Sequence, residues 1–240
     1  MKQRLDRLLV ERGLAESREK AQAIIMAGEV FVDGQKALKP GHSVDASSRI
    51  EVAGKAPYVS RGGVKLAAAL ESFRIEVDGA ICMDVGSSTG GFTDCLLQHG
   101  AARVHAVDVG GGQLDWKLRN DPRVVVHEGI NARNLRFDDI GEQIGLATLD
   151  VSFISATLVL PAMVPLLRPE GRMVILVKPQ FEVGRGQVGK GGIVRRPELH
   201  QAACLRVTEA VKSLGFETSI IESPILGAEG NKEFLLYARH

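Results

Sequence analysis

The spacing of apolar residues over the first 55 positions predicts two helices followed by short strands. Three leucines between residues 5 and 9 recur at the spacing of one helix face. Ser17 is a typical N-cap for a second helix over 18–27. Alternating apolar and polar residues then predict a hairpin that turns at Asp33-Gly34, and a further strand over 49–52. This pattern is typical of a small α+β domain.

From residue 81 onward the chain alternates between strand-like and helix-like segments, and the helical ones include 155–168 and 197–214. Such alternation predicts a Rossmann-like α/β fold, with a mostly parallel sheet that helices cover on both faces. We therefore expect a small domain over 1–55, a linker over 56–64 and an α/β domain over 65–240. The strand-like runs are 81–85, 104–109, 124–127, 146–150, 173–177, 218–222 and 234–238.

Charge is distributed unevenly along a chain whose formal net charge is only +1. Residues 1–75 hold 13 Lys/Arg and 9 Asp/Glu, residues 76–175 hold 8 and 13, and residues 176–200 hold 5 and 2. The basic excess thus lies near the N-terminus and in one late segment, an arrangement that can contact RNA on a nearly neutral protein. A chance asymmetry of the surface explains it as well, so charge alone leaves the partner open.

The cysteines and histidines give no metal or disulfide pattern. The three cysteines are far apart and odd in number, and the six histidines show no ligand spacing, so we expect neither a disulfide framework nor a metal site. The charged, amphipathic N-terminal segment has no signal-peptide core, and no apolar run is long enough to span a bilayer. We expect a cytoplasmic protein without membrane contact, acting as a monomer or weak dimer.

The strongest local motif is DVGSSTGGFT at 84–93, a buried strand followed by a glycine-rich turn and a helix over 92–98. Asp84 precedes the first glycine, where a carboxylate would repel a pyrophosphate but suit a cationic amino group. Asp108 ends the next strand, where it can accept both ribose hydroxyls. These features predict S-adenosylmethionine rather than NAD. The expected cofactor-binding residues are Asp84, Gly86, Ser87, Gly90, Gly91, Phe92, Asp108, Asn131 and Asp150.

The residues after the fourth and fifth strands of this domain indicate which atom would be methylated. The segment DVSF at 150–153 lacks the prolines of amino-methylating enzymes, and no cysteine nucleophile follows these strands. Asp150 and Lys178 do follow them. To accept a proton from a ribose hydroxyl, Lys178 must be neutral, a state that burial and a second cation, Lys65, would favour. The alternative is a lysine that only caps the strand end.

The segment RLDRLLVERGLAESREKAQAIIMAGEVFVDG resembles the S4-like RNA-binding domain of ribosomal proteins and rRNA-modifying enzymes. In that family, basic side chains meet structured RNA, which is recognised mainly by shape and phosphate contacts. A small protein-binding or dimerising module is the alternative. The glycine-rich basic loop over 182–196 is either an RNA clamp or a surface insertion. The expected RNA-binding residues are Arg4, Arg7, Arg18, Lys20, Arg61, Arg185, Lys190, Arg195 and Arg196.

Five motifs in order, SRGGVKL, DVGSSTGGFTD, LDVSFIS, VKPQFE and GNKEF, resemble the TlyA-type rRNA 2′-O-methyltransferases over essentially the whole chain. The resemblance implies an FtsJ-like catalytic domain with a tetrad of Lys65, Asp150, Lys178 and Glu233. Lys178 would be the base, Lys65 and Asp150 would tune it, and Glu233 would orient the ribose. At 56–59 the chain departs from the family pattern, because APYV replaces a segment that often carries Trp.

The same resemblance implies a cytidine of ribosomal RNA as the target, in naked RNA or in a ribosomal subunit. Because the chain is short for the family, we expect large-subunit RNA. Two other classes stay open. One is a non-catalytic, rRNA-binding assembly factor. The other is a membrane-lytic protein, since some family members are called hemolysins, although the lack of a spanning segment disfavours it.

Overall fold

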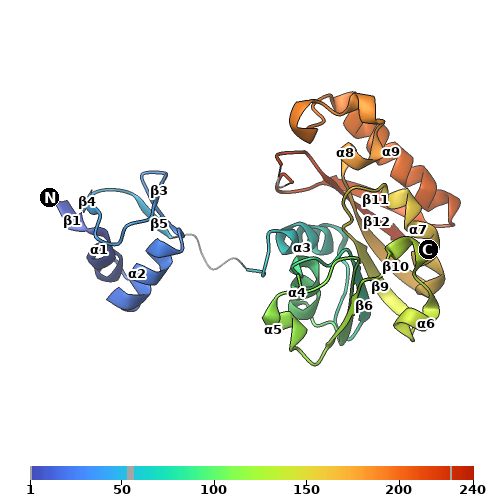
Figure 1. The fold of residues 1–240 in the computed structure, drawn as a ribbon, viewed down its shortest axis with the longest axis horizontal. Coiled ribbons are helices and arrows are strands. Elements are labelled where there is room, and N and C mark those ends of the chain that lie inside the picture. Colours follow the sequence, from blue (N-terminus) through green and yellow to red (C-terminus); the bar gives the residue numbers. More distant parts are fainter. Residues whose placement is uncertain (1, 53–56, 228) are drawn as a thin grey trace. The chain divides into compact units, whose positions relative to one another are not determined.

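The computed structural model describes residues 2–52, 57–227 and 229–240, and the chain divides into two units, Met1–Pro57 and Tyr58–His240 (Figure 1). Residue 56, where the expected linker begins, lies outside the described residues. The rest of that expected linker, from Tyr58 onward, belongs to the larger unit, and its last three residues are already helical. A Cβ on Gly63 would overlap the ring of Tyr58, so glycine lets this segment pack closely.

The smaller unit has the helices that its apolar pattern predicts. They are α1 (Leu5–Glu11) and α2 (Arg18–Met26), and Ser17 Oγ accepts a hydrogen bond from the backbone N–H of Lys20 at 3.2 Å. Strand β2 (Val30–Val32) pairs antiparallel with β3 (Gln35–Ala37) and β5 (Ile50–Val52). Strands β1 (Lys2–Arg4) and β4 (Ser43–Asp45) form a second sheet, too short for its pattern to be visible in the sequence. The core consists of Leu5, Leu8, Leu9, Ala21, Ile25, Val30, Ala37 and Val44.

A seven-stranded sheet organises the larger unit, in the order β11-β12-β10-β9-β6-β7-β8. The pairs from β10 to β8 are parallel, whereas β12 runs antiparallel to both β10 and β11. The expected Rossmann-like, mostly parallel sheet is therefore confirmed. Its strands are β6 (Ile81–Val85), β7 (Arg103–Asp108), β8 (Val124–Glu128), β9 (Ile144–Leu149), β10 (Leu167–Val177), β11 (Glu217–Glu222) and β12 (Phe234–Arg239).

Helices cover both faces of this sheet, with a separate apolar core under each (Figure 1). One face is covered by α3 (Gly62–Phe73), α4 (Gly91–Gln98) and α5 (Trp116–Arg119). The other is covered by α6 (Phe137–Ile140), α7 (Leu160–Met163) and α9 (Pro197–Ser213). The short helix α8 (Pro179–Glu182) follows β10. The helix expected over 155–168 is instead three short pieces between 156 and 166, because Pro161 and Pro165 each lie in the first turn of a new piece, and residues 167 and 168 already belong to β10.

The strand order reverses at β6. The chain runs from β6 to β7 and β8 on one side, then crosses to β9 on the other. Sheets of this kind bind ligands at the carboxyl ends of the strands beside such a reversal. The ends of β6 and β9 therefore mark where a site is expected.

Candidate active site

The glycine-rich turn between β6 and α4 lies at this edge, close to the end of β9. Gly86 has a φ of +84°, and a Cβ there would overlap the carbonyl oxygen of Asp150. A Cβ on Gly91 would overlap Ser60 Oγ. Both glycines line a cavity. Without side chains at these positions, the backbone of the turn can meet a ligand directly.

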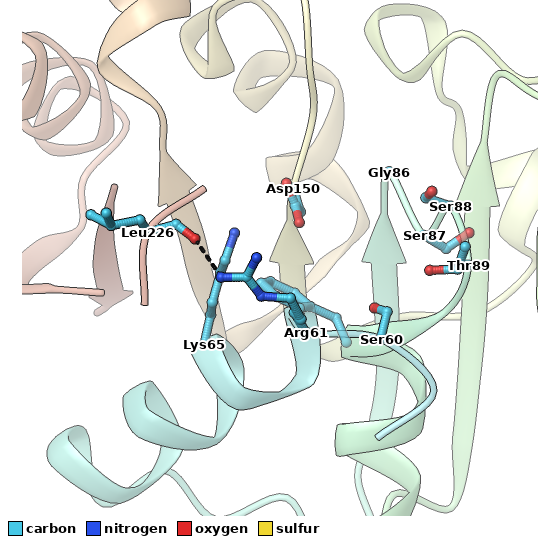
Figure 2. Close-up of a pocket in the computed structure, with 12 residues that line it drawn as sticks. Ser60, Arg61, Lys65, Gly86, Ser87, Ser88, Thr89, Asp150 and Leu226 are labelled. Carbon is cyan, nitrogen blue, oxygen red and sulfur yellow. Dashed lines mark hydrogen bonds between the residues drawn. The ribbon is translucent and has the colours of Figure 1, made fainter. Parts of the chain in front are cut away.

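Two adjoining cavities of about 450 and 390 Å³ open at the turn, a size typical of ligand sites. Gly86, Ser88 and Asp150 line both, so the cavities are two compartments of one cleft. The first compartment is also lined by Ser60, Arg61, Lys65, Ser87 and Phe92, several of which Figure 2 shows. The second is lined by Val107, Asp108, Ile130, Asn131, Arg133 and Phe153. Gly90 packs against Leu114 and Leu118 behind the turn.

Asp108 ends β7 and faces the second compartment. Its Oδ2 accepts a hydrogen bond from the backbone N–H of Ser88 at 2.8 Å, and its Oδ1 accepts one from Gly110 at 2.7 Å. A carboxylate oxygen has two lone pairs, so both oxygens can still accept ribose hydroxyls. Asn131 lines the same compartment, and its Oδ1 accepts a hydrogen bond from the backbone N–H of Arg133 at 3.1 Å.

Asp84 lies elsewhere than the sequence analysis expects. Its side chain is fully buried and lines neither compartment. Oδ2 accepts a hydrogen bond from Thr93 Oγ1 at 2.7 Å and Oδ1 accepts one from Thr148 Oγ1 at 2.9 Å. Burial raises the pKa of Asp84 to about 6, against the opposing effect of these two hydroxyls. The carboxyl group therefore ties α4 to β9 beneath the turn instead of reaching into the cleft.

Four charged side chains form two ion pairs beside the cleft. Lys65 of α3 and Glu233, which precedes β12, are both buried, with Nζ and Oε2 2.5 Å apart. Lys178 follows β10, and its Nζ lies 2.5 Å from Asp150 Oδ1 and donates a hydrogen bond to Ser152 Oγ at 2.9 Å. Lys65 and Asp150 line the same compartment (Figure 2). The fold thus brings together residues from four separate segments, with one carboxylate for each lysine.

The sequence profile of the FtsJ-like methyltransferases matches residues 58–240, and that of the S4 domain matches residues 3–50. The chain belongs to the FtsJ-like methyltransferase family. Within that family it belongs to the TlyA-type proteins. A Mycobacterium tuberculosis (strain CDC 1551 / Oshkosh) protein named 16S/23S rRNA (cytidine-2'-O)-methyltransferase TlyA is 48% identical over 239 residues, which are 98% of this chain and 89% of that protein.

Some relatives of this FtsJ-like protein carry the name hemolysin. Hemolysin A of Brachyspira hyodysenteriae is 45% identical over 236 residues, which are 98% of each chain. The solved structure "Putative hemolysin from Streptococcus thermophilus" has a TM-score of 0.77 and 45% identity, and covers 99% of this chain and 88% of that one. Within the described part of the present chain, no helix has both the length and the apolar character to cross a membrane. The same residues hold no group of three or more His, Cys, Asp or Glu that could bind a metal ion.

The basic residues expected to bind RNA have different surroundings in this FtsJ-like methyltransferase. Arg4 and Arg18 both contact the buried Asp6, 2.9 and 3.0 Å from its Oδ2, although their side chains remain 45% exposed. The hydrogen bond from Arg4 is the main reason why the pKa of Asp6 lies well below its usual range. Lys20 pairs with Glu16, and Arg61 Nη2 donates to the carbonyl oxygen of Leu226 at 3.2 Å. Arg7, Lys190, Arg195 and Arg196 are exposed, and the side chain of Arg185 lies outside what the structure describes.

Two buried side chains that the sequence analysis did not single out hold segments of the site in place. Asn231 accepts a hydrogen bond from the backbone N–H of Val194 at 2.9 Å and donates one to the carbonyl oxygen of Gly192 at 3.0 Å. It thereby attaches the glycine-rich basic loop to the turn before Glu233. Glu182, four residues after Lys178, binds the segment that follows Asp150. Asn231 belongs to the motif GNKEF and Glu182 to the motif VKPQFE. Each is a polar residue close to a predicted catalytic one, and that proximity is the feature of the sequence by which they could have been found.

Proposed function

We propose that this protein transfers a methyl group from S-adenosylmethionine to the 2′-hydroxyl of a cytidine in ribosomal RNA. The observation that carries the proposal is the pairing of Lys178 with Asp150 beside a cleft that Lys65 also lines. The 48% identity to a protein named 16S/23S rRNA (cytidine-2'-O)-methyltransferase TlyA supports it. Large-subunit RNA as the target and the cytoplasm as the location stay predictions from the sequence.

The residues present fit S-adenosylmethionine. The second compartment combines apolar walls at Val107 and Ile130 with the Asp108 carboxylate, which suits an adenosine. The first compartment offers backbone of the turn at Gly86 and Ser87, which suits the amino-acid end of the molecule. When bound, this cofactor supplies the electrophilic methyl group. Asp84 supports the turn from within the core, and its proposed role is to shape the site instead of contacting the ligand.

Lys178 is the proposed base. In its neutral form, Lys178 would accept the proton of the 2′-hydroxyl through Nζ, while bound S-adenosylmethionine would supply the methyl group and be left as a neutral thioether. The hydrogen bond to Ser152 and the contact with Asp150 hold Nζ beside two residues that line the second compartment. The Asp150 carboxylate then compensates the ammonium charge that the transfer creates. The Lys65–Glu233 pair, of which Lys65 lines the first compartment, is proposed to orient the ribose.

The RNA is proposed to reach the cleft through exposed aromatic and basic residues. Phe153 borders the second compartment, is 87% exposed, and its ring centroid lies 5.5 Å from that of Phe181. An exposed aromatic ring beside a methyl-donor site can stack on an unpaired base. The S4 domain and the exposed residues Lys190, Arg195 and Arg196 are proposed to contact phosphates.

The experiment that tests the proposal measures transfer of labelled methyl from S-adenosylmethionine to rRNA, and maps alkali-resistant linkages in the product. We expect Lys178→Ala to lower the single-turnover rate by about 10²- to 10⁴-fold, while calorimetry shows unchanged cofactor affinity. Lys190→Ala is the matched control, because it removes an exposed lysine outside the cleft and should change mainly RNA affinity.

Each possible result decides between hypotheses. An unchanged rate in Lys178→Ala would refute the assignment of the base. If the wild-type protein binds ribosomal subunits or naked rRNA but leaves every linkage alkali-labile, the methyltransferase proposal fails and an assembly factor is favoured. Release of dye from lipid vesicles by the pure protein would instead support the lytic activity that the name Hemolysin A suggests.

A further inference from the structure

Glu182 is a buried carboxylate for which the proposed methyl transfer has no chemical use. The residue is 3% exposed and ends the four-residue helix α8. Its Oε2 accepts a hydrogen bond from Ser155 Oγ at 2.5 Å, and its Oε1 accepts one from the backbone N–H of Ala156 at 2.7 Å. Buried carboxylates are costly unless they are paired or hydrogen-bonded, so this one is held by a specific structure.

The two groups that donate hydrogen bonds to the Glu182 carboxylate lie at and just after the end of the segment 150–155, which carries Asp150, Ser152 and Phe153, and Arg206 Nε lies 3.9 Å from Oε2. The start of this segment is held by the sheet, where the backbone N–H of Asp150 donates to the carbonyl oxygen of Val85 at 2.9 Å. Lys178 contacts the segment near this start, through Asp150 and Ser152. The two ends of helix α8 thus contact the same segment. Lys178, which precedes the helix, binds near the start of the segment, and Glu182, the last residue of the helix, binds at its end.

The segment has a strained backbone between these two contacts. Phe153 has a φ of +68°, a left-handed conformation that is rare for a residue with a large side chain, and 87% of the residue is exposed. Such a conformation persists only where the surrounding structure fixes it. The Phe153 ring contacts Phe181 of α8, with centroids 5.5 Å apart, but 87% of the residue is exposed, so the hydrogen bonds at the two ends of the segment supply much of the restraint.

We propose that Glu182 is a positioning residue, which fixes the far end of segment 150–155 and thereby aligns Ser152 and Asp150 with Lys178. Arg206 supports it from outside, because its Nη1 donates to the carbonyl oxygen of Glu182 at 2.9 Å. The inference deepens the proposed methyl transfer and rests on it for its kinetic consequence. Its structural consequence, the anchoring of the segment, holds independently.

The test compares Glu182→Ala, Glu182→Gln and Ser155→Ala with the wild type. Glutamine keeps the anchor, since its Oε1 can accept from Ala156 and its Nε2 can donate to Ser155 Oγ. Alanine removes both hydrogen bonds, and Ser155→Ala removes one. The matched control is Glu198→Ala, which deletes an exposed carboxylate at the start of α9.

The first measurement is the rate at which chymotrypsin cuts after Phe153. Cleavage requires the segment to leave its fixed conformation, so it reports the anchor whether or not the protein methylates RNA. We expect Glu182→Ala to be cut at least about tenfold faster, Ser155→Ala a few-fold faster, and Glu182→Gln and Glu198→Ala at the wild-type rate. If wild type and Glu182→Ala are cut equally fast, the inference is overturned.

The second measurement is single-turnover methyl transfer at saturating cofactor and RNA. A displacement of about 1 Å can lower such a rate by about 10²-fold, and this is the loss we expect for Glu182→Ala, with unchanged cofactor affinity. Glu182→Gln should restore the rate. If Glu182→Gln resists chymotrypsin but transfers methyl as slowly as Glu182→Ala, the charge of Glu182 matters and not its anchoring of the segment, and the positioning role is refuted.

Where Glu182→Ala fails to fold, Ser155→Ala serves as the test: if it is cleaved and turns over at the wild-type rates, the positioning role is refuted. If the wild type itself transfers no methyl group, only the proposed function is refuted.

Discussion

The buried pair of Lys65 and Glu233 leads to a quantitative prediction about stability. The residues are 8% and 3% exposed. Replacing Glu233 by Gln keeps the shape of the side chain but leaves the Lys65 ammonium without a negative partner. Breaking a fully buried ion pair costs about 3 to 5 kcal/mol. Because Lys65 also lines an open cavity where water can solvate its ammonium, we expect Glu233→Gln to lower the free energy of unfolding by only about 2 to 3 kcal/mol.

The double variant tests whether this loss comes from the charge. Lys65→Met alone should cost a similar amount, because it leaves the Glu233 carboxylate buried and unpaired. With both substitutions neither charge remains, and we expect stability within about 1 kcal/mol of the wild type. Urea unfolding followed by circular dichroism measures the free energies. For a unit of this size, each single variant should also melt roughly 5 to 10 °C lower.

The methyl-transfer assay separates the two roles of the pair. All three variants should be inactive, including the stable double variant, because the proposed site needs both groups. If the losses in free energy of unfolding of the two single variants simply add in the double variant, the two side chains are not energetically coupled. That result would refute the charge-based explanation. A fully active double variant would remove the pair from the proposed mechanism.

Three further predictions concern other parts of the molecule. Folding raises the pKa of Asp84 from 3.8 to about 6. Between these pH values the folded protein keeps a proton on Asp84 that the unfolded chain has lost. The free energy of unfolding therefore falls by about 3 kcal/mol as the pH rises from about 4 to 6. Asp84→Asn should remove this decline in urea unfolding, and an identical decline in the variant would contradict the assignment. Gly86→Ala should weaken cofactor binding at least about tenfold in calorimetry, since its Cβ overlaps Asp150, whereas Gly141→Ala, with a similar φ but open space around it, should not. Asp6→Asn should destabilise the smaller unit by about 2 kcal/mol, because the hydrogen bonds from Arg4 and Arg18 lose their charged acceptor. Amide hydrogen exchange of residues 2–52 measures this loss, and an unchanged exchange rate in the variant would contradict the prediction.

Central strands of the larger unit such as β6 and β9 could be predicted from the sequence because they are buried on both faces and bounded by turns. The expected and observed spans of β6 agree at both ends. The three-residue strands β1 and β4 were not predicted, whereas the equally short β2 and β3 were, because the turn at Asp33-Gly34 marks them as a hairpin. The broken helix at 155–168 shows a different limit. There the apolar pattern continues through two prolines and predicts one helix, whereas the prolines divide the backbone into short helical pieces.

The candidate site was predictable where a motif fixes local geometry, and not where distant segments meet. The glycine-rich turn and Asp108 lie along the cleft because both lie at the carboxyl ends of neighbouring parallel strands. Asp84 differs because its side chain points into the core, where Thr93 of the same motif and Thr148 of the distant strand β9 both donate hydrogen bonds to it. The meeting of Lys65 with Glu233 could be inferred only from family resemblance, and Glu182 was missed because its partners belong to another loop.

The Lys65–Glu233 contact joins residues 168 positions apart. During translation, a nascent chain that has emerged through α8 already holds the glycine-rich turn, Asp108, Asp150 and Lys178, yet its Lys65 still lacks its carboxylate partner. Domains begin to fold while they are being synthesised, so this cleft would be completed only after residue 233 has left the ribosome. A product of stalled synthesis that ends before residue 233 would therefore be both unstable and unable to modify the ribosomes around it.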